Sequence, residues 1–371
     1  MRILFVSGTA VGGSASSTRE LATALAARGH EVGLLARVAT APRRWMLQHR
    51  LVNLAVAREG SGLGAGAAWA AGRIGRRARL VRTEPFREWS TILVENALAG
   101  VRGSFEPDVV VASSIGRMAW RSVRPELAAA GIPTVLYMRE ESSIGHLTSS
   151  GAPPDLLLAN AHQHEVAARG AGFVAHVVPS VVDLTRARVA TTREVVLFVN
   201  PVEVSGREIA VGVARACPDL RFAFVESWPL SDDERRWLDA ACAGLANVER
   251  RPRVDDLARL YGDARVLLVP YRTNGRPRVV LEAQVNGIPV LATDLPALTE
   301  AVGPGGVAVS FDAGPGEWAR HLRDLLAPDR YDALAAAALE HAARPEVDPA
   351  AIVTRFETLV GALVDGGVGA A

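Results

Sequence analysis

Short apolar runs alternate with helical patterns along most of this 371-residue chain. The pattern is clearest at the start: Ile3–Ser7 has the composition of a buried strand, Gly8 to Ser14 forms a glycine-rich turn, and Ser17–Arg28 carries apolar residues at helical spacing. A further apolar run follows at Glu31–Leu35. Strand, crossover helix and strand make up the unit from which parallel sheets are built. The sequence therefore predicts an α/β protein.

The same alternation begins again in the second half. Glu194–Val199 and Arg221–Val225 have the composition of strands, and Arg207–Ala216 between them has helical spacing. A chain of 371 residues also exceeds the roughly 100–200 residues of one ordinary domain. We therefore predict two Rossmann-like domains with parallel sheets, joined through the polar stretch Leu184–Arg193.

Three parts are predicted along the chain. Residues 1–186 and 187–346 form the two domains, and residues 347–371 carry a final helix that packs back on the first domain. Ligands of open parallel sheets bind beyond the carboxyl ends of the strands, where the strand order reverses. Two such sheets that face each other predict an interdomain cleft, and we expect the chemistry there.

Composition argues against several classes of protein. Forty-one basic and forty acidic residues give a net charge of +1, so no nucleic acid is expected as a partner. The two cysteines, Cys217 and Cys242, have neither metal-ligand nor disulfide-framework spacing. The opening run Met1–Ser7 is too short for a secretion signal, and no run approaches the roughly 18 apolar residues of a spanning helix. We expect a cytoplasmic protein.

The chain contains no lysine, so all forty-one basic side chains are arginines. Any phosphate site must therefore be built from guanidinium groups, hydroxyls or backbone N–H groups.

The most informative stretch begins in a strand-to-helix loop at Pro270–Pro277. Pro277 suits the first position of the following helix, with Thr273 or Asn274 as its cap. Helical N–H groups and the side chains of Arg276 and Arg278 predict an anion site there.

Glu282 lies one to two turns into the same predicted helix and is expected to face the cleft. A carboxylate repels phosphate but accepts two hydrogen bonds from a ribose diol. The stretch therefore suggests a site for a nucleotide with a diphosphate.

This stretch resembles the retaining nucleotide-sugar glycosyltransferases of family four. Their hallmark is a glutamate, seven residues, a second glutamate and then Ala-x-x-x-Gly-x-Pro-Val. Glu282 matches the second glutamate, and the residues that match the rest are Ala283, Gly287, Pro289 and Val290. Glu300–Gly303 resembles the next loop of the family.

Less specific likenesses extend over most of the chain, at Pro107–Val110, Val178–Asp183 and Asn200–Gly206. The resemblance implies the GT-B fold of two facing Rossmann-like domains. It also implies that the first domain binds an acceptor and the second a nucleotide sugar.

The chain departs from the family at several positions. Asn274 stands where the first glutamate of the pair contacts the donor sugar. Pro201 and Ser205 replace the arginine and lysine that bind the diphosphate, and Pro277 replaces a glycine. Arg207, Arg276 and Arg278 are the candidate substitutes, since one guanidinium can hold two phosphate oxygens.

The resemblance implies a front-face displacement in which the departing diphosphate takes the acceptor's proton and the anomeric configuration is retained. No metal and no cofactor are expected, and the donor is expected to be a UDP- or GDP-sugar. We expect a small-molecule acceptor, such as a natural-product intermediate, and a monomer or homodimer. The expected donor-binding residues are Gly12, Gly13, Ser205, Arg207, Arg251, Gly275, Arg276, Pro277, Arg278, Val279 and Glu282.

The expected catalytic residues are Glu282, Asn274, Arg139 and Glu140. Arg139 and Glu140 follow a predicted strand and either approach the transferred sugar and the acceptor proton or form a solvated loop salt bridge. The loop at Gly12 and Gly13 either contacts a ligand or is an ordinary tight turn.

Arg251 has two interpretations as well: it passes the base of the nucleotide, or it is a surface charge.

A basic cluster lies between residues 43 and 87. Relatives that act on lipids use basic amphipathic helices to reach anionic membranes. The glycines and alanines from Gly60 to Gly75 would insert poorly, so we expect a solvated face and no membrane association. The cluster consists of Arg43, Arg44, Arg50, Arg58, Arg73, Arg76, Arg77, Arg79, Arg82 and Arg87.

Two other functions fit the same residues. Loss of the family's glutamate, lysine and arginine together is typical of a non-catalytic GT-B protein that binds a nucleotide. A sugar-nucleotide epimerase with the same fold is the other alternative, although the motif at Glu282 favours a transferase.

Overall fold

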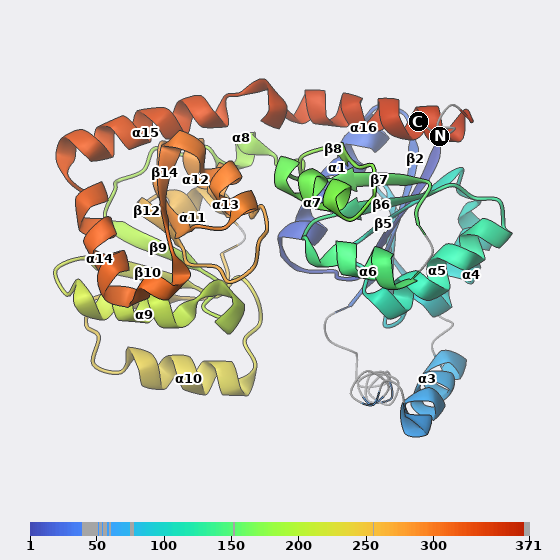
Figure 1. The fold of residues 1–371 in the computed structure, drawn as a ribbon, viewed down its shortest axis with the longest axis horizontal. Coiled ribbons are helices and arrows are strands. Elements are labelled where there is room, and N and C mark those ends of the chain that lie inside the picture. The colour runs from blue at the N-terminus through green and yellow to red at the C-terminus, as the bar shows by residue number, and fades with distance from the viewer. Residues whose placement is uncertain are drawn as a thin grey trace. The chain divides into compact units, whose positions relative to one another are not determined.

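A computed structural model describes residues 1–38, 51, 54, 58, 61–74, 78–150, 153–254 and 256–366 of the chain (Figure 1). The chain divides into two compact units. Unit 1 comprises residues 1–160 and 164–181 together with the C-terminal segment from residue 352, and unit 2 comprises residues 161–163 and 182–351.

The described part of unit 1 contains a sheet of eight strands in the order β3-β4-β2-β1-β5-β6-β7-β8. Every neighbouring pair is parallel except β3 and β4, which are antiparallel at one edge. The strands are β1 (Arg2–Ser7), β2 (Glu31–Arg37), β3 (Arg79–Arg82), β4 (Arg87–Thr91), β5 (Val109–Ser113), β6 (Thr134–Met138), β7 (Leu156–Ala159) and β8 (His176–Val177).

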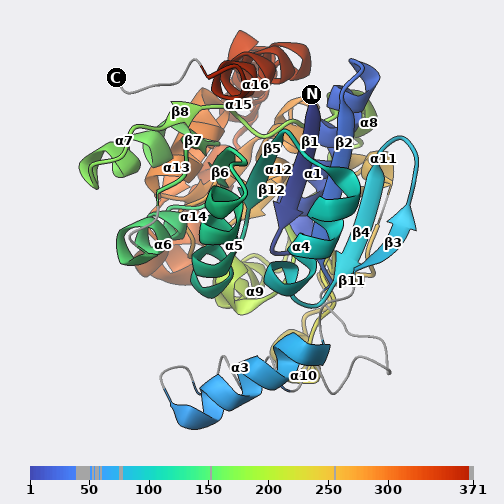
Figure 2. The ribbon, with the colours of Figure 1, turned by 90° about the vertical axis from the view of Figure 1, so that its right-hand side faces the viewer.

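Helices cover both faces of this sheet because its central strands are apolar on both sides. In β1, Ile3 and Phe5 enter one core and Leu4 and Val6 enter the other. Phe5 stacks on Phe356 of the C-terminal helix with ring centroids 6.0 Å apart. Figure 2 shows α4 and α5 in front of the strands of this unit. The helices are α1 (Gly12–Ala27), α3 (Gly62–Ile74), α4 (Val94–Phe105), α5 (Arg117–Ala129), α6 (Ser142–Ser150), α7 (His162–Gly170) and α16 (Pro349–Val364).

Unit 2 contains an all-parallel sheet of six described strands in the order β11-β10-β9-β12-β13-β14. The strands are β9 (Val195–Val199), β10 (Arg221–Val225), β11 (Val248–Arg251), β12 (Ala264–Val269), β13 (Val290–Thr293) and β14 (Gly306–Val309). The α-helices are α8 (Leu184–Ala187), α9 (Arg207–Ala216), α10 (Asp232–Cys242), α11 (Leu257–Tyr261), α12 (Arg278–Gln284), α13 (Pro296–Val302), α14 (Gly314–Leu325) and α15 (Pro328–Ala342). The 3₁₀ helices are η2 (Glu203–Ser205), η3 (Gly303–Gly305), η4 (Phe311–Ala313) and η5 (Pro345–Val347).

The strand order in each unit reverses at one point. In unit 2, β10 and β11 follow β9 in one direction, and β12, β13 and β14 extend in the other. In unit 1 the same reversal lies between β1 and β5. Loops that leave the carboxyl ends of such strands diverge, and ligands of open parallel sheets bind between them.

The prediction of an α/β chain with two parallel-sheet units is confirmed. The predicted start of the first helix was wrong, because α1 begins at Gly12 rather than Ser17. Its first turn consists of small residues, Gly12 to Ser16, which carry no apolar periodicity. Gly12 and Gly13 therefore belong to the helix and not to the turn before it.

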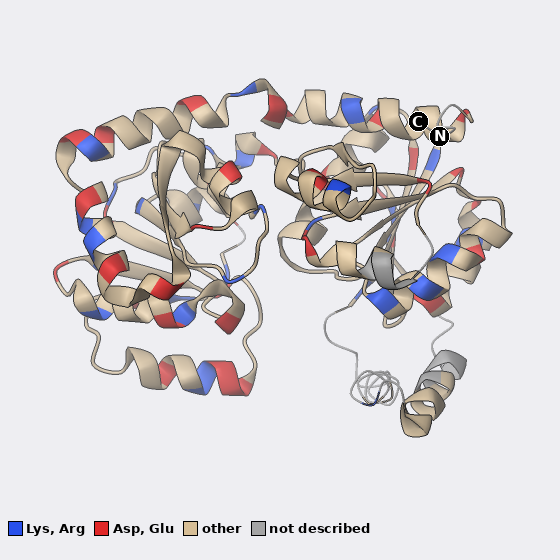
Figure 3. Cartoon of the chain, in the orientation of Figure 1, with Lys and Arg blue, Asp and Glu red and all other residues tan. Residues whose placement is uncertain are grey.

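Among the described residues, none of the helices is both long and apolar enough to span a bilayer. Figure 3 shows acidic and basic residues interspersed along both units. From the basic cluster, Arg43, Arg44, Arg50, Arg76 and Arg77 lie outside the described residues.

Candidate functional site

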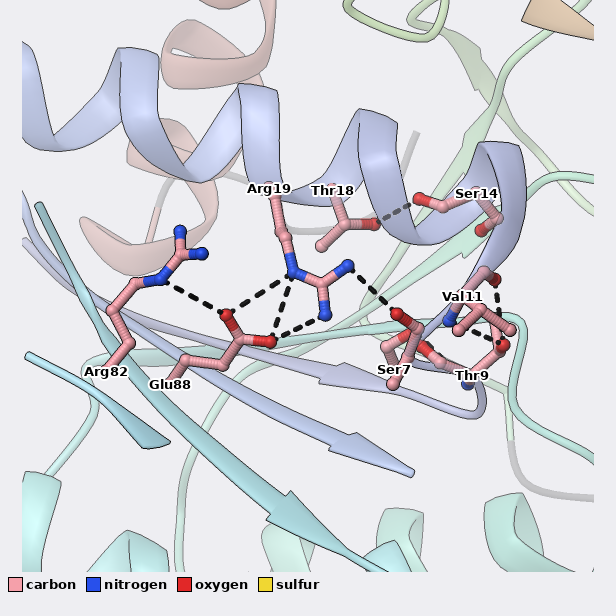
Figure 4. Close-up of polar contacts among 9 residues, drawn as sticks. Ser7, Thr9, Val11, Ser14, Thr18, Arg19, Arg82 and Glu88 are labelled. Atoms are coloured by element: carbon pink, nitrogen blue, oxygen red, sulfur yellow. Dashed lines mark hydrogen bonds and ion pairs between the residues drawn. The ribbon is translucent and has the colours of Figure 1, made fainter. Parts of the chain in front are cut away.

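The loop after β1 in unit 1 is held by a partly buried ion pair (Figure 4). Arg19 of α1 donates from Nη2 to Glu88 at 2.6 Å and from Nη1 to the carbonyl of Ala10 at 3.0 Å. Glu88 lies on β4, its side chain is 8% exposed, and Arg82 approaches it to 3.8 Å from the other side. The pair fixes the backbone of the loop that precedes Gly12.

A close approach between backbones shapes the same loop. A Cβ on Gly8 would lie 1.8 Å from the carbonyl oxygen of Ser114, so only glycine fits. The hydroxyls of Ser14 and Ser114 are 2.6 Å apart, which joins the first turn of α1 to the loop after β5. Gly12 has φ of +87°, and Val11 before it supplies no side-chain cap. The start of α1 thus lies where the strand order of unit 1 reverses.

Arg139 and Glu140 differ sharply in environment. Arg139 is buried, donates from Nη1 to the hydroxyl of Ser180 at 2.5 Å and lies 3.8 Å above the ring of Tyr137. The alternative of a solvated salt bridge is therefore wrong for Arg139. Glu140 is exposed.

Two loops at the reversal point of unit 2 are packed against each other. Gly206 ends the loop after β9 with φ of +71°, and a Cβ there would lie 1.8 Å from the carbonyl oxygen of Pro270. Arg272 donates its backbone N–H to the carbonyl of Val204 at 3.0 Å. The loops after β9 and β12 therefore form one continuous backbone surface at the start of α9.

A buried polar network lies beside this surface. The Tyr261 hydroxyl, at the end of α11, donates to Oε2 of Glu282 at 2.8 Å, and Arg278 donates from Nε to Oε1 at 3.0 Å. Tyr261 is completely buried, and the side chains of Arg278 and Glu282 are 10% and 5% exposed. Both oxygens of the carboxylate are thus engaged, and each retains a second lone pair that can accept a hydrogen bond.

Burial keeps Tyr261 and the neighbouring Tyr271 protonated. Burial, followed by the charge and hydrogen bond of Glu282, raises the pKa of Tyr261 well above its usual range. Burial and the charge of Glu282 raise the pKa of Tyr271, against the opposing effect of its hydrogen bond with Ser205. Ser205, at the position where the sequence lacks the family's lysine, is 2% exposed and lies beside Tyr271.

Asn274 stabilises a helix other than the one predicted. Its Oδ1 accepts the N–H of Ala297 at 2.8 Å and so caps the start of α13. Pro277, and not Thr273 or Asn274, is the N-cap residue of α12, and it supplies no side-chain hydrogen bond. The helix α12 has only seven residues, so its dipole is short.

Positive charge gathers around the loop after β12. The guanidinium of Arg276 is 13% exposed and lies 4.0 Å from the carboxylate of Glu300. Burial and the charge of Arg276 lower the pKa of Arg344 to about 10. Gly275 and Val279 flank Arg276 and Arg278 on this segment and are partly buried.

Arg207 and Arg251, the other two arginines expected at the donor site, contact residues other than Glu282. Arg207, the first residue of α9, stacks on Trp237 at 4.1 Å, and within the described chain its buried Nη1 has no hydrogen-bond partner. Arg251 ends β11 instead of lying in the following loop, and it pairs with Asp263 at 2.6 Å and Glu249 at 2.8 Å.

Residues 195–328 match the family described as glycosyl transferases group 1. The second half of the chain contains a group 1 glycosyltransferase domain. The match begins with the first residue of β9, ends with the first residue of α15 and includes the network around Glu282.

Known glycosyltransferases resemble part of the chain in sequence and nearly all of it in fold. D-inositol 3-phosphate glycosyltransferase from Thermobispora bispora is 40% identical over 110 residues, which are 28% of this chain and 26% of that protein. The match thus spans about a quarter of the length of this curated relative.

Solved structures match over nearly the whole chain. Sucrose-phosphate synthase from Thermosynechococcus elongatus has a TM-score of 0.78 at 16% identity and covers 99% of this chain and 100% of its own. HepE from Anabaena in complex with UDP-glucose has a TM-score of 0.72 at 16% identity and covers 97% of this chain and 100% of its own. The fold is therefore GT-B, as predicted.

The described residues of the chain contain no group of three or more His, Cys, Asp or Glu side chains arranged to hold a metal ion. The glycosyltransferase domain brings Ser205, Gly275, Arg276, Arg278 and Glu282 together around the ends of β9 and β12. Arg251 lies instead at the end of β11, the edge strand beyond β10.

Sequence reasoning missed Tyr261 and Tyr271 of the glycosyltransferase domain. Tyr271 comes two residues after β12 ends, and a polar aromatic residue at the carboxyl end of a buried strand is a signal for a ligand site. Nothing in the sequence marks Tyr261, because its contact with Glu282 spans 21 residues.

Proposed function

We propose that this protein transfers a sugar from a nucleotide diphosphate sugar to a small-molecule acceptor. The observation that carries the proposal is the buried carboxylate of Glu282, held by Tyr261 and Arg278 at the reversal point of a group 1 glycosyltransferase domain. A buried carboxylate is costly unless it is paired, and this one has acceptor capacity left for a ligand. The UDP-glucose complex of HepE, which shares the fold, supports a nucleotide sugar as donor.

In this proposal Glu282 accepts hydrogen bonds from the ribose diol. Arg276 in the loop before α12 and Arg278 in the first turn of α12 balance the charge of the diphosphate, because their guanidinium groups lie close to Glu282 and are largely buried. Arg207 begins α9 next to the same loops, and its buried Nη1 provides a further donor for the leaving group. Guanidinium groups in a site of low dielectric stabilise the charge that develops on the diphosphate as it leaves.

We propose that the reaction retains the anomeric configuration and needs no metal ion. The departing diphosphate takes the proton from the acceptor hydroxyl as the new bond to the anomeric carbon forms on the same face. Asn274 does not supply the carboxylate of the family pattern, and its Oδ1 is used by Ala297, so recognition of the sugar falls to neighbouring groups.

We propose that unit 1 binds the acceptor at the loops after β1, β5 and β6. The start of α1 at Gly12 and Gly13, the hydroxyls of Ser14 and Ser114, and the exposed Glu140 provide polar contacts there. A small specialised acceptor suits a site lined by hydroxyls and backbone groups.

A thermal-shift panel with UDP, GDP, ADP and dTDP tests the donor site. We expect at least one diphosphate to raise the melting temperature of the wild type and to do so much less for Glu282→Ala, since binding to the native state stabilises it. Glu317→Ala, at an exposed position of α14, is the matched control and should respond as the wild type does. Equal stabilisation of wild type and Glu282→Ala would remove Glu282 from the donor site.

A non-catalytic nucleotide-binding protein is the second candidate, and one observation favours it. Ser205 is buried where the family has a lysine, so this position contributes no cation to the leaving group. Incubation of the wild type with UDP-glucose and GDP-mannose separates the two candidates. Release of the diphosphate supports the transferase, whereas binding without release supports the second candidate. Conversion of the sugar without any acceptor would indicate an epimerase instead.

A further inference from the structure

We propose that Tyr261 is a positioning residue that sets the carboxylate of Glu282 to accept both hydroxyls of the donor's ribose. The inference rests on the proposed function. Its basis is the hydrogen bond of 2.8 Å between the Tyr261 hydroxyl and Oε2 of Glu282, in which both side chains are buried. Tyr261 does not contact the donor in this proposal; it acts through Glu282.

The two donors to Glu282 are not equivalent. Arg278 precedes Glu282 by one turn on the same helix and reaches Oε1 through a long, flexible side chain. Tyr261 comes from α11, and its rigid ring is completely buried. An orientation imposed from a separate element by a packed ring is held more firmly than one imposed by a neighbour on the same helix. Tyr261 therefore fixes the plane of the carboxylate.

With one donor on each oxygen, the lone-pair count of a carboxylate leaves one acceptor position on each. Oε2 receives the phenol and Oε1 receives the guanidinium, and each oxygen can accept one more hydrogen bond. Two neighbouring hydroxyls of a ribose can then donate one bond to each oxygen. Without the phenol the carboxylate is free to rotate towards Arg278, and the two acceptor positions no longer match a diol.

The charges around Tyr261 keep it a donor. Burial and the carboxylate of Glu282 raise the pKa of Tyr261. Tyr271 raises this pKa further, and Arg278 lowers it. The phenol therefore stays protonated and donates a hydrogen bond to Glu282 throughout the neutral pH range. Tyr271 is also close to Glu282, but its hydroxyl bonds to Ser205 and not to the carboxylate.

Tyr261→Phe removes one oxygen and tests the role directly. The probes are the diphosphate that stabilises the wild type in the panel of UDP, GDP and ADP, and its 2′,3′-dideoxy counterpart, with Kd measured by calorimetry. We expect Tyr261→Phe to raise Kd for the ribose form about tenfold, the effect of losing one hydrogen bond to a charged group. Kd for the dideoxy form should change less than about twofold, because that ligand makes no contact with Glu282.

Tyr331→Phe is the matched control. Tyr331 is also a buried tyrosine of unit 2, and its hydroxyl donates to the carbonyl of Arg265 at 3.0 Å, at the start of β12. Removing that hydroxyl costs stability but should leave the affinity ratio of the two ligands at the wild-type value. A purely structural role of Tyr261 would give the same result as this control.

The possible outcomes separate the inference from the function on which it rests. If no diphosphate binds the wild type, the proposed function is wrong and the inference falls with it. If the wild type discriminates ribose from dideoxyribose and Tyr261→Phe discriminates equally well, only the inference is wrong.

If Tyr261→Phe does not fold, 3-fluorotyrosine at position 261 provides a second measurement that keeps the hydroxyl. Its ¹⁹F resonance should move on binding of the ribose form and much less on binding of the dideoxy form. Equal movement with both ligands would overturn the inference.

Discussion

Gly206 lies so close to the carbonyl of Pro270 that no side chain fits between them. A Cβ at position 206 would be 1.8 Å from that oxygen, and the backbone has φ of +71°. This contact joins the loops after β9 and β12, which carry the candidate donor site. The site therefore depends on a glycine that touches no ligand in our account.

Gly206→Ala should destabilise the protein by about 3 kcal/mol or more, since the methyl group meets backbone that cannot move aside cheaply. Gly244 is the matched control: it has φ of +80°, and nothing lies within 4 Å of the position of a Cβ. Gly244→Ala should cost only the strain of a left-handed alanine, about 1 kcal/mol. Urea unfolding followed by circular dichroism measures both. Equal costs would show that the two loops are not packed as described.

Arg278→Gln should weaken binding of a nucleoside diphosphate much more than binding of the matching nucleoside. The reason is that in the proposed donor site the guanidinium balances phosphate charge, which a neutral amide cannot do. Calorimetry with UDP and uridine, or the corresponding guanosine pair, gives the two affinities. Arg320→Gln, at an exposed position of α14, is the control. Equal losses of affinity for the nucleoside and the diphosphate would mean that Arg278 acts only by holding Glu282.

His341 makes the stability of unit 2 depend on pH. Burial, followed by the charges of Arg344 and Arg276, lowers the pKa of His341 below its ordinary value of 6.5. The unfolded chain then binds a proton more readily than the native one, so stability falls as the pH falls below about 6.5. His341→Phe, which keeps a ring against Gly303, should lose less stability than the wild type between pH 7 and pH 5. Parallel pH profiles of the melting temperature for the two proteins would contradict this.

Glu88→Ala should destabilise unit 1 by about 3 kcal/mol, because it leaves Arg19 largely buried without its carboxylate. Glu31→Ala removes an exposed pair with Arg87 and should cost less than about 1 kcal/mol. Denaturant unfolding of the two variants gives the comparison. Similar small costs for both would mean that the Arg19 pair does not hold the loop before α1.

The sequence predicted those features that depend on neighbours along the chain. A final helix was predicted within residues 347–371, and the structure has α16 there at Pro349–Val364. Ser231 caps α10 and Glu234 completes the capping box, a local arrangement of residues three apart in the sequence. The start of α1 was missed because its small residues have no periodicity.

Contacts between distant segments were not predictable. The cap that Asn274 provides for Ala297 spans 23 residues, and the sequence offered only nearby helices for it. The bond between Tyr261 and Glu282 depends on how α11 and α12 pack, which no local pattern encodes. Glu282 was singled out from its motif, but its two protein partners required the structure.

A crystal soaked with the diphosphate that stabilises the wild type tests the central claim most directly. We predict electron density for the ribose with both hydroxyls within hydrogen-bond distance of the Glu282 carboxylate and for the diphosphate beside Arg278. Ribose bound elsewhere, with Glu282 contacting only Tyr261 and Arg278, would contradict the account.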